Sequence, residues 1–235
     1  MNQIRTVLFD LGGVIITLDP QQAVDRFKAL GLADAEKRLD SYTQSGIFGD
    51  LEHGLITDED FRREFSLLVG REVSHEACAH AWQGYALEVP KRNLEALKQL
   101  KEQGYRVLLL SNTNPYMMEW AESPAFDGEG HPVSYYFDRC YLSYQMQMMK
   151  PSEQIFREVL RNEKTFASEV LFVDDGPRNV ATASQLGMLT LQPQNGEDWT
   201  GKLFERLEFK IRIREEVIAY FWSVVGSECS GPAEA

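Results

Sequence analysis

The chain has 235 residues, of which 43% are apolar, and its 24 basic against 36 acidic residues give a formal net charge of −12. This length and apolar content can bury one main core and still carry an insertion, so extensive disorder is excluded. The negative charge argues against nucleic acid as a partner. The longest apolar stretch, 217–225, is far shorter than the ~20 residues of a membrane-spanning helix. We therefore expect a soluble protein with no membrane partner.

Cysteine usage and the N-terminus indicate the compartment. Cys78, Cys140 and Cys229 lie far apart, are odd in number and lack metal-ligand spacing, which is typical of a reducing environment. The first residues carry Arg5 and Asp10 around a short apolar run without a small-residue cleavage site, so a secretory signal is not expected. These features predict a cytoplasmic protein.

Short apolar runs that stop at polar or glycine residues predict buried strands. They lie at 6–9, 106–110, 140–142, 170–173 and 189–191. Helical periodicity separates them: one helix follows Pro90 and stops at Gly104, and others begin near Pro151 and Pro177. Strands that alternate with helices predict an α/β fold with a parallel sheet covered by helices on both faces.

Residues 19–89 break this alternation, because they show helical patterns and turn signals but no convincing strand. The expected helices lie at 21–30, 34–43, 57–69 and 74–85. Thr57 followed by Asp60 resembles a capping box at the start of the third helix. We predict an inserted all-helical cap at 19–89, on a core made of 1–18 and 90–196.

Residues 197–235 form a C-terminal extension that ends in a small, polar tail. Within it, a helical apolar stripe needs a cover. The stripe consists of Val217, Tyr220, Phe221 and Val224. Packing of this extra helix on the sheet would leave a monomer, and a contact between two copies would make a homodimer, so both states stay open.

Polar residues follow the predicted strands where open α/β sheets bind ligands. Asp10 closes the first strand, Ser111 and Asn112 close the second in chain order, and Asp174 and Asp175 close another. Lys150 stands directly before Pro151, at the entry to a helix. Carboxylates that hold magnesium and a lysine that offsets phosphate charge suit phosphoryl chemistry, in which Asp10 would be the nucleophile.

Four segments resemble, in order, the motifs of the haloacid dehalogenase-like (HAD) hydrolase superfamily. They are VLFDLGGV at 7–14, LLSNT at 109–113, KP at 150–151 and LFVDD at 171–175. The resemblance implies a Rossmann-like core and the helical-cap (C1) phosphatase branch. The first motif and residues 48–61 are also similar to bacterial glucose-1-phosphate phosphatases.

This resemblance implies roles for the strand-end residues. Asp10 would be the nucleophile and, with the Gly12 carbonyl and Asp175, would hold Mg²⁺. Asp174 would lie next to these ligands without binding the metal directly, and Asn179 would stabilise the loop that carries the acidic pair. The phosphate would be bound by Ser111, Asn112 and Lys150, and Lys150 would also assist catalysis.

One position departs from the family pattern, since Gly12 stands where most of these phosphatases carry a general-acid aspartate. Three explanations stay open: an activated leaving group, as in an anomeric sugar phosphate; Glu52 or His53 of the cap in place of the acid; or a weakly catalytic protein. Glu52 and His53 precede Gly54 in a turn-like stretch where charges are usually solvated. Trp82 and Tyr85 are spaced as a packed face more than as a sugar platform.

The predicted function is a magnesium-dependent phosphatase that hydrolyses a small phosphorylated metabolite, with a sugar phosphate favoured, through an aspartyl-phosphate intermediate. The alternatives are a metal-independent 2-haloacid dehalogenase and a non-catalytic protein that binds a phosphometabolite or a partner. The related dehalogenases need no magnesium, so the Asp174–Asp175 pair favours the phosphatase.

Overall fold

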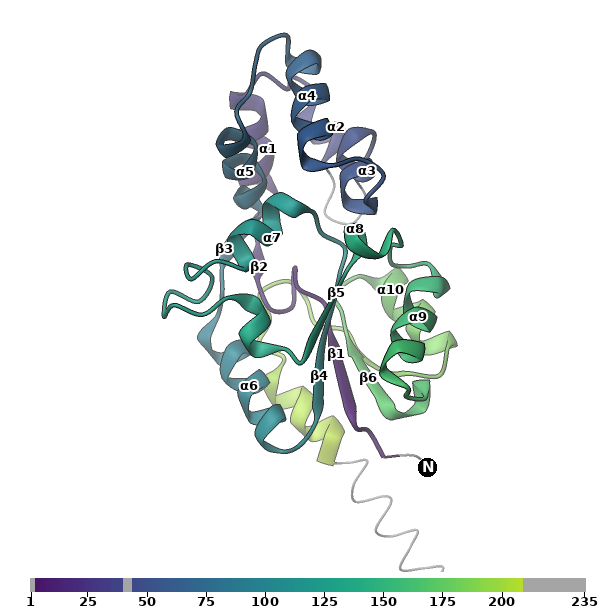
Figure 1. The fold of residues 1–235 in the computed structure, drawn as a ribbon. Helices are drawn as coiled ribbons and strands as arrows, with labels where there is room; N and C mark the ends of the chain where they lie inside the picture. Colours follow the sequence, from purple (N-terminus) through teal and green to yellow (C-terminus); the bar gives the residue numbers. More distant parts are fainter. Residues whose placement is uncertain (1–2, 40–43, 209–235) are drawn as a thin grey trace, which may run out of the picture.

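A five-stranded parallel sheet lies at the centre of the core in the computed structural model, which describes residues 3–39 and 44–208 (Figure 1). Its strand order is β5-β4-β1-β6-β7, so the first strand is central. The strands are β1 (Thr6–Phe9), β4 (Arg106–Ser111), β5 (Arg139–Leu142), β6 (Val170–Val173) and β7 (Leu189–Leu191). The predicted parallel α/β sheet is confirmed.

Both faces of the sheet are buried, which explains the uninterrupted apolar runs of the central strands. Phe9 of β1 faces the helix that carries Leu97, whereas the neighbouring Leu8 packs with Phe156 on the other face. Figure 1 shows α6 and α9 on opposite sides of the sheet. The core helices are α6 (Lys91–Glu102), α7 (Pro115–Ala121), α8 (Ser143–Met146), α9 (Glu153–Glu163) and α10 (Pro177–Gln185). Short 3-10 turns lie at Gln83–Tyr85, Val133–Tyr136 and Ala167–Glu169.

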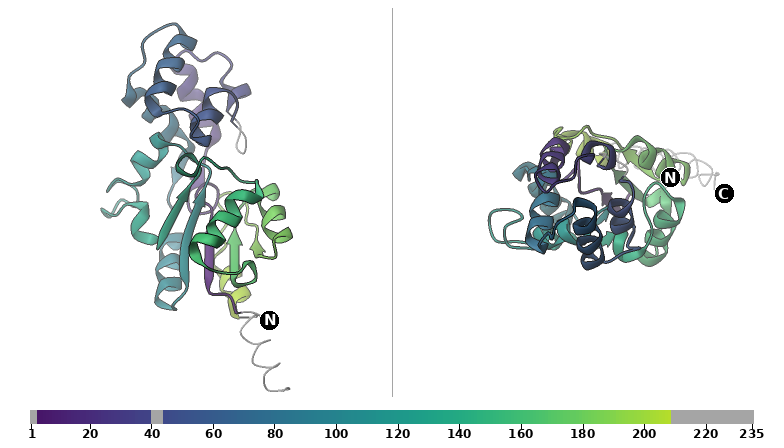
Figure 2. Two further views of the ribbon diagram at one scale, coloured as in Figure 1. Left: turned by 45° about the vertical axis from the view of Figure 1, so that its right-hand side comes forward. Right: turned by 90° about the horizontal axis from the view of Figure 1, so that it is seen from above.

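A helical cap stands beyond the carboxyl ends of the strands (Figures 1 and 2). Its helices are α1 (Pro20–Ala29), α2 (Ala35–Arg38), α3 (Ile47–His53), α4 (Asp58–Val69) and α5 (His75–Trp82). Aromatic rings form its own hydrophobic core, with Phe27 in edge-to-face contact with Phe48, Phe65 and Trp82 at centroid distances of 5.2, 5.6 and 5.4 Å. The cap therefore has a core separate from that of the sheet.

The structure corrects three expectations for the cap. The helix expected at 34–43 is shorter, because α2 ends at Arg38 and Leu39 is extended, while 40–43 lie outside the described residues. The stretch expected to be turn-like is helix α3. Residues 86–88 form a short strand, β3 (Ala86–Glu88), which pairs antiparallel with β2 (Thr17–Leu18) where cap and core join.

Glycines explain why α3 escapes prediction. Gly49 lies inside the helix, where glycine lowers helix propensity, but a Cβ there would come within 2.7 Å of the Gln44 carbonyl oxygen. The helix is stabilised by burial of Phe48 and Leu51, which are fully inaccessible to solvent. Tertiary packing thus overrides local propensity.

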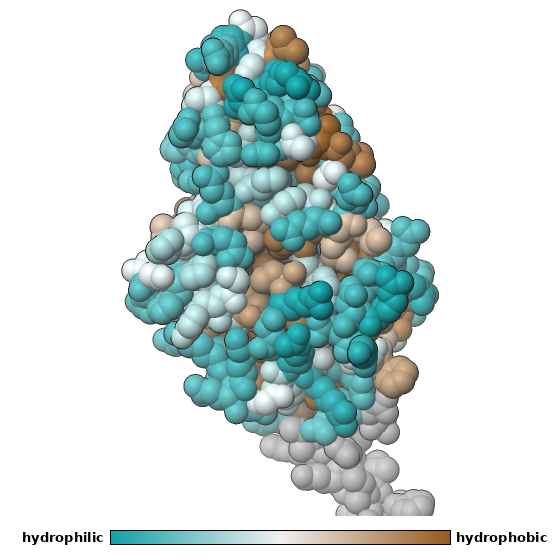
Figure 3. Space-filling model, in the orientation of Figure 1, coloured by the Kyte–Doolittle hydropathy of each residue, from teal (hydrophilic) through white to brown (hydrophobic). Residues whose placement is uncertain are grey.

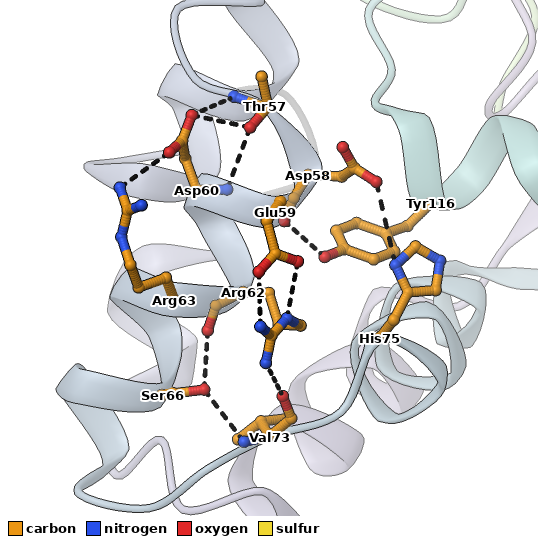
Figure 4. A network of polar contacts seen from close by, with 10 residues as sticks. All are labelled: Thr57, Asp58, Glu59, Asp60, Arg62, Arg63, Ser66, Val73, His75 and Tyr116. Carbon is orange, nitrogen blue, oxygen red and sulfur yellow. Dashed lines mark hydrogen bonds and ion pairs between the residues drawn. The ribbon is translucent and has the colours of Figure 1, made fainter.

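The capping box predicted at Thr57 is present and lies next to a link between cap and core (Figure 4). The Thr57 side chain accepts a hydrogen bond from the Asp60 N–H at 3.1 Å. Tyr116 of core helix α7 donates from its hydroxyl to the Asp58 carbonyl oxygen at 2.7 Å, and its ring contacts His75 of α5. This contact joins the first turns of α4 and α5 to the core.

The start of the C-terminal extension packs on the sheet. Residues 200–208 are helical, and Trp199, Leu203 and Leu207 are buried in the core, where the Trp199 indole donates to the Val14 carbonyl oxygen at 2.8 Å. The apolar stripe at 217–224 lies outside the described residues.

The face of the molecule seen in Figure 3 is mostly hydrophilic, with hydrophobic patches on the cap and in the central region below it. None of the helices within 3–39 and 44–208 is long and apolar enough to cross a membrane.

Candidate active site

The strand order brings the predicted site residues to one edge of the sheet. β1 pairs on one side with β4 and on the other with β6, with Phe9 opposite both Leu109 and Val173. Asp10 therefore lies between the segments that follow the two neighbouring strands. This edge faces the cap.

Lys150 joins two of the acidic residues. Its Nζ lies 2.8 Å from an Asp10 carboxylate oxygen and 2.6 Å from Asp174 Oδ2, and all three side chains are largely or fully buried. Burial disfavours the lysine charge, but Asp10 and Asp174 outweigh it and raise the pKa of Lys150. The lysine is thus held as a cation directly beside Asp10.

The carboxylate of Asp174 is fully engaged in supporting the site. Its Oδ1 accepts hydrogen bonds from the Gly176 N–H at 2.8 Å and from the Asn179 amide at 3.0 Å, while Oδ2 meets Lys150. Asp175, in contrast, lines the cavity beside Asp10. Only Asp175 of the pair is therefore available to a ligand.

The site carries an excess of negative charge. Burial raises the pKa of Asp10 to about 7, against the opposing charge of Lys150, and the two neighbouring aspartates add to the rise. Burial, together with the charge of Asp174, raises the pKa of Asp175 to about 6. This crowding of negative charge around one lysine favours the protonated forms of Asp10 and Asp175 until a further cation is present.

The residues present fit a divalent cation. One oxygen of each of Asp10, Asp174 and Asp175 lies within 4.8 Å of the others, and Gly12 borders the same space. Because Asp174 is engaged by Lys150, Gly176 and Asn179, the ligands for a cation would come from Asp10, Asp175 and the Gly12 carbonyl. Oxygen ligands with a net negative charge are what Mg²⁺ prefers. Gly13 adopts φ +75°, and a Cβ there would come within 2.2 Å of an Asp175 carboxylate oxygen, so the loop needs glycine at this point.

Asn112 and Ser111 lie at the end of β4 as expected, with different environments. The Asn112 side chain accepts from the Lys150 N–H and donates to the Lys150 carbonyl oxygen, both at 2.9 Å, which holds the lysine backbone in place. The Ser111 side chain is buried, and its hydroxyl makes a long contact of 3.4 Å with the Asn112 carbonyl oxygen. Asn112 therefore positions Lys150, while Ser111 borders the space beneath the cap.

Two cavities that share lining residues open between core and cap. The first, of about 140 Å³, lies over Asp10, Lys150 and Asp175. The second, of about 90 Å³, extends toward Trp82 and Tyr85 of the cap. Both are bordered by Gly12, Leu18, Gln44, Glu52 and Asn112. A ligand bound at Asp10 can thus extend beneath the cap.

Glu52 lies in this shared space, so the expectation of a solvated side chain is wrong. Burial raises the pKa of Glu52 to about 8, with Asn114 working against the rise and the charge of Asp10 adding to it. The Ser143 hydroxyl lies 2.6 Å from the Glu52 carbonyl oxygen and accepts a hydrogen bond from the Thr113 N–H at 3.0 Å. These contacts anchor α3 of the cap on the core.

His53 does not share this position. It borders a neighbouring cavity that shares Gln44, Lys150 and Asn179 with the first cavity but does not have Asp10 among its lining residues. The structure therefore separates the two cap residues that the sequence suggested as alternatives.

Sequence reasoning missed several residues that border the cavities. Asn195 closes one side by exchanging two hydrogen bonds with the backbone of Leu18, at 2.8 and 2.9 Å, across 177 positions of sequence. Asn114 lines the second cavity, and Gln44 lines both. No local sequence pattern could reveal these residues, because the cavities are formed by cap and core segments that are far apart in the sequence.

The fold and the site combine a capped α/β core with a largely buried carboxylate, that of Asp10, directly after the first strand. Residues 4–187 match the family model described as haloacid dehalogenase-like hydrolase. The chain belongs to this hydrolase family, which confirms the resemblance noted in the sequence.

Several named relatives and solved structures are similar to most of the chain. A D-ribitol-5-phosphate phosphatase from Bacteroides thetaiotaomicron is 46% identical over 200 residues, which are 85% of this chain and 97% of that protein. A HAD-like family hydrolase from Porphyromonas gingivalis has a TM-score of 0.83 at 41% identity, covering 88% of this chain and 98% of its own. A HAD family enzyme from B. thetaiotaomicron, in complex with magnesium and inorganic phosphate, has a TM-score of 0.80 at 36% identity, with 85% and 98% covered.

Proposed function

We propose that this hydrolase is a magnesium-dependent phosphatase that acts on a small phosphorylated sugar or polyol. The observation that carries the proposal is the Lys150 cation held between Asp10 and Asp174 below a cavity that Asp175 also borders. The similarity to a D-ribitol-5-phosphate phosphatase supports a phosphorylated polyol or sugar as the substrate.

In the proposed reaction an Asp10 carboxylate oxygen attacks the phosphorus, and the bond from phosphorus to the organic oxygen breaks. The resulting aspartyl phosphate is then attacked by water, which releases inorganic phosphate and returns Asp10. Lys150 and Ser111 bind the phosphate oxygens. Magnesium, held by Asp10, Asp175 and the Gly12 carbonyl, would screen the charges of carboxylate and phosphate from one another.

We assign the proton donor for the leaving oxygen to Glu52. Gly12 has no side chain that could donate, whereas Glu52 borders the cavity above Asp10. Its raised pKa keeps the proton on the carboxyl group at neutral pH. His53 is not among the described residues that line this cavity, so we favour Glu52 as the proton donor.

In this proposal the cap, through its contact with the core, shields the cavity from bulk water during the reaction. The excess of carboxylates favours a metal-dependent phosphatase over a metal-independent dehalogenase. We expect the enzyme to act in the cytoplasm, as a monomer or homodimer, on a small phosphorylated metabolite and without nucleic-acid or membrane partners.

The test is phosphate release from ribitol 5-phosphate, glucose 1-phosphate and a generic aryl phosphate, with and without Mg²⁺. We expect metal-dependent release that falls to background in Asp10→Asn. Asp25→Asn, an exposed aspartate of α1, is the matched control and should behave as the wild type. Release that persists in Asp10→Asn, or needs no metal, would contradict the proposal.

A further inference from the structure

The second cavity contains two hydrogen-bond donors that lack acceptors. Within the described part of the chain, neither Trp82 Nε1 nor Asn114 Nδ2 has a hydrogen-bond partner, and the two side chains are 1% and 0% exposed. Both residues border the cavity of about 90 Å³ next to the nucleophile's cavity. Buried donors in folded proteins almost always have a partner, so an acceptor from outside the chain is expected here.

The surroundings of the two donors show that their position is well determined. Asn114 uses its Oδ1 to accept from the Met117 N–H at 3.1 Å at the start of α7, which leaves its Nδ2 for another partner. The Glu52 carboxyl group is near enough for Asn114 to lower its pKa, but not at full hydrogen-bonding geometry. Trp82 is held by the aromatic rings of the cap core.

The chemistry of the cavity selects the kind of acceptor. Its lining residues within the described ranges include no lysine or arginine, and Glu52, the carboxylic acid among them, keeps its proton at neutral pH. Two neutral donors without a cation suit neutral oxygens, such as hydroxyl groups, better than a second anionic group. A volume of about 90 Å³ leaves room for several water-sized groups.

We propose that the Trp82 indole N–H and the Asn114 amide bind hydroxyl oxygens in the organic part of the substrate, and thereby select a hydroxylated chain over a bare alkyl chain. The inference rests on the proposed phosphatase function and adds the residues that determine specificity.

The test compares ribitol 5-phosphate with pentyl phosphate, which has the same chain length without hydroxyl groups. In Trp82→Phe, which keeps an aromatic ring but removes the N–H, we expect the ratio of the two kcat/KM values to fall about tenfold, mainly through a higher KM for ribitol 5-phosphate. Asn114→Ser keeps a side-chain oxygen for the helix cap and should lower the ratio in the same direction. Trp120→Phe, outside both cavities, is the matched control.

The outcomes are distinguishable. An equal loss on both substrates would assign Trp82 a purely structural role and overturn the inference, as would an unchanged ratio in both variants. Thermal melting checks that each variant is folded, and Asn114→Ser decides the matter if Trp82→Phe does not fold. Wild-type enzyme that releases phosphate with no preference for the hydroxylated chain overturns the inference alone, and wild-type enzyme that releases none overturns the proposed function as well.

Discussion

Replacement of Glu52 by glutamine tests the proposed proton donor directly. With a pKa of about 8, roughly nine in ten Glu52 side chains carry the proton at pH 7, whereas an ordinary glutamate would be almost fully ionised. Glutamine keeps the shape but cannot give up a proton in the reaction. General-acid catalysis contributes ~10²- to 10⁴-fold, so we expect a loss of that order in kcat on alkyl phosphates.

The pH dependence provides a second measurement. Activity of the wild type on alkyl phosphates should fall as the pH rises through about 8, where Glu52 loses its proton, and this fall should be absent in Glu52→Gln.

The stability of the folded protein should depend on pH for the same reason. Because the folded pKa is raised, the folded protein binds more protons than the unfolded chain between the ordinary pKa and about 8, so stability declines as the pH rises through this window. Thermal melting should show Glu52→Gln gaining on the wild type over the same range.

The leaving group separates catalysis from structure. An aryl phosphate needs little protonation of its leaving oxygen, so Glu52→Gln should retain most activity on it. Equal losses on aryl and alkyl phosphates would refute the reasoning. Glu95→Gln, an exposed residue of α6, is the control. Gly12→Asp added to Glu52→Gln should restore part of the activity, because the new carboxyl group can donate the proton. The position has room for it, since the new Cβ would meet the flexible end of the Leu18 side chain at 3.0 Å.

Three further predictions concern the charges beneath the cavity. Lys150→Ala should reduce phosphate release to background and lower the unfolding free energy by about 3–5 kcal/mol in chemical denaturation, because buried carboxylates lose their cation; unchanged stability would contradict the buried pairing. Gly13→Ala should weaken Mg²⁺ binding in calorimetry by displacing Asp175, whereas Gly104→Ala, at a similar φ of +84° with free space around it, should not. The rise in melting temperature on adding Mg²⁺ should shrink as the pH falls through 7 to 6, because Asp10 and Asp175 must lose their protons to bind metal, and a shift independent of pH would argue against these ligands.

The sequence by itself determined the core of the fold. The runs at 7–9, 107–110 and 170–173 are wholly apolar because those strands are covered on both faces, and such burial leaves a pattern that local sequence analysis detects. The positions of Asp10 and Asp175 follow from the same pattern, since residues after parallel strands meet at one edge. The family resemblance supplied the expected roles of these residues.

Only the tertiary structure decided how the cap meets the site. Helix α3 is flanked by glycines and contains Gly49, so its local sequence does not favour a helix. It forms because Phe48 and Leu51 are buried against residues that are distant in the sequence. The same packing brings Glu52 above Asp10 and sends His53 to another cavity. A spacing in sequence cannot distinguish these two neighbours, because their environments are created by core segments about ninety positions away, such as Ser143.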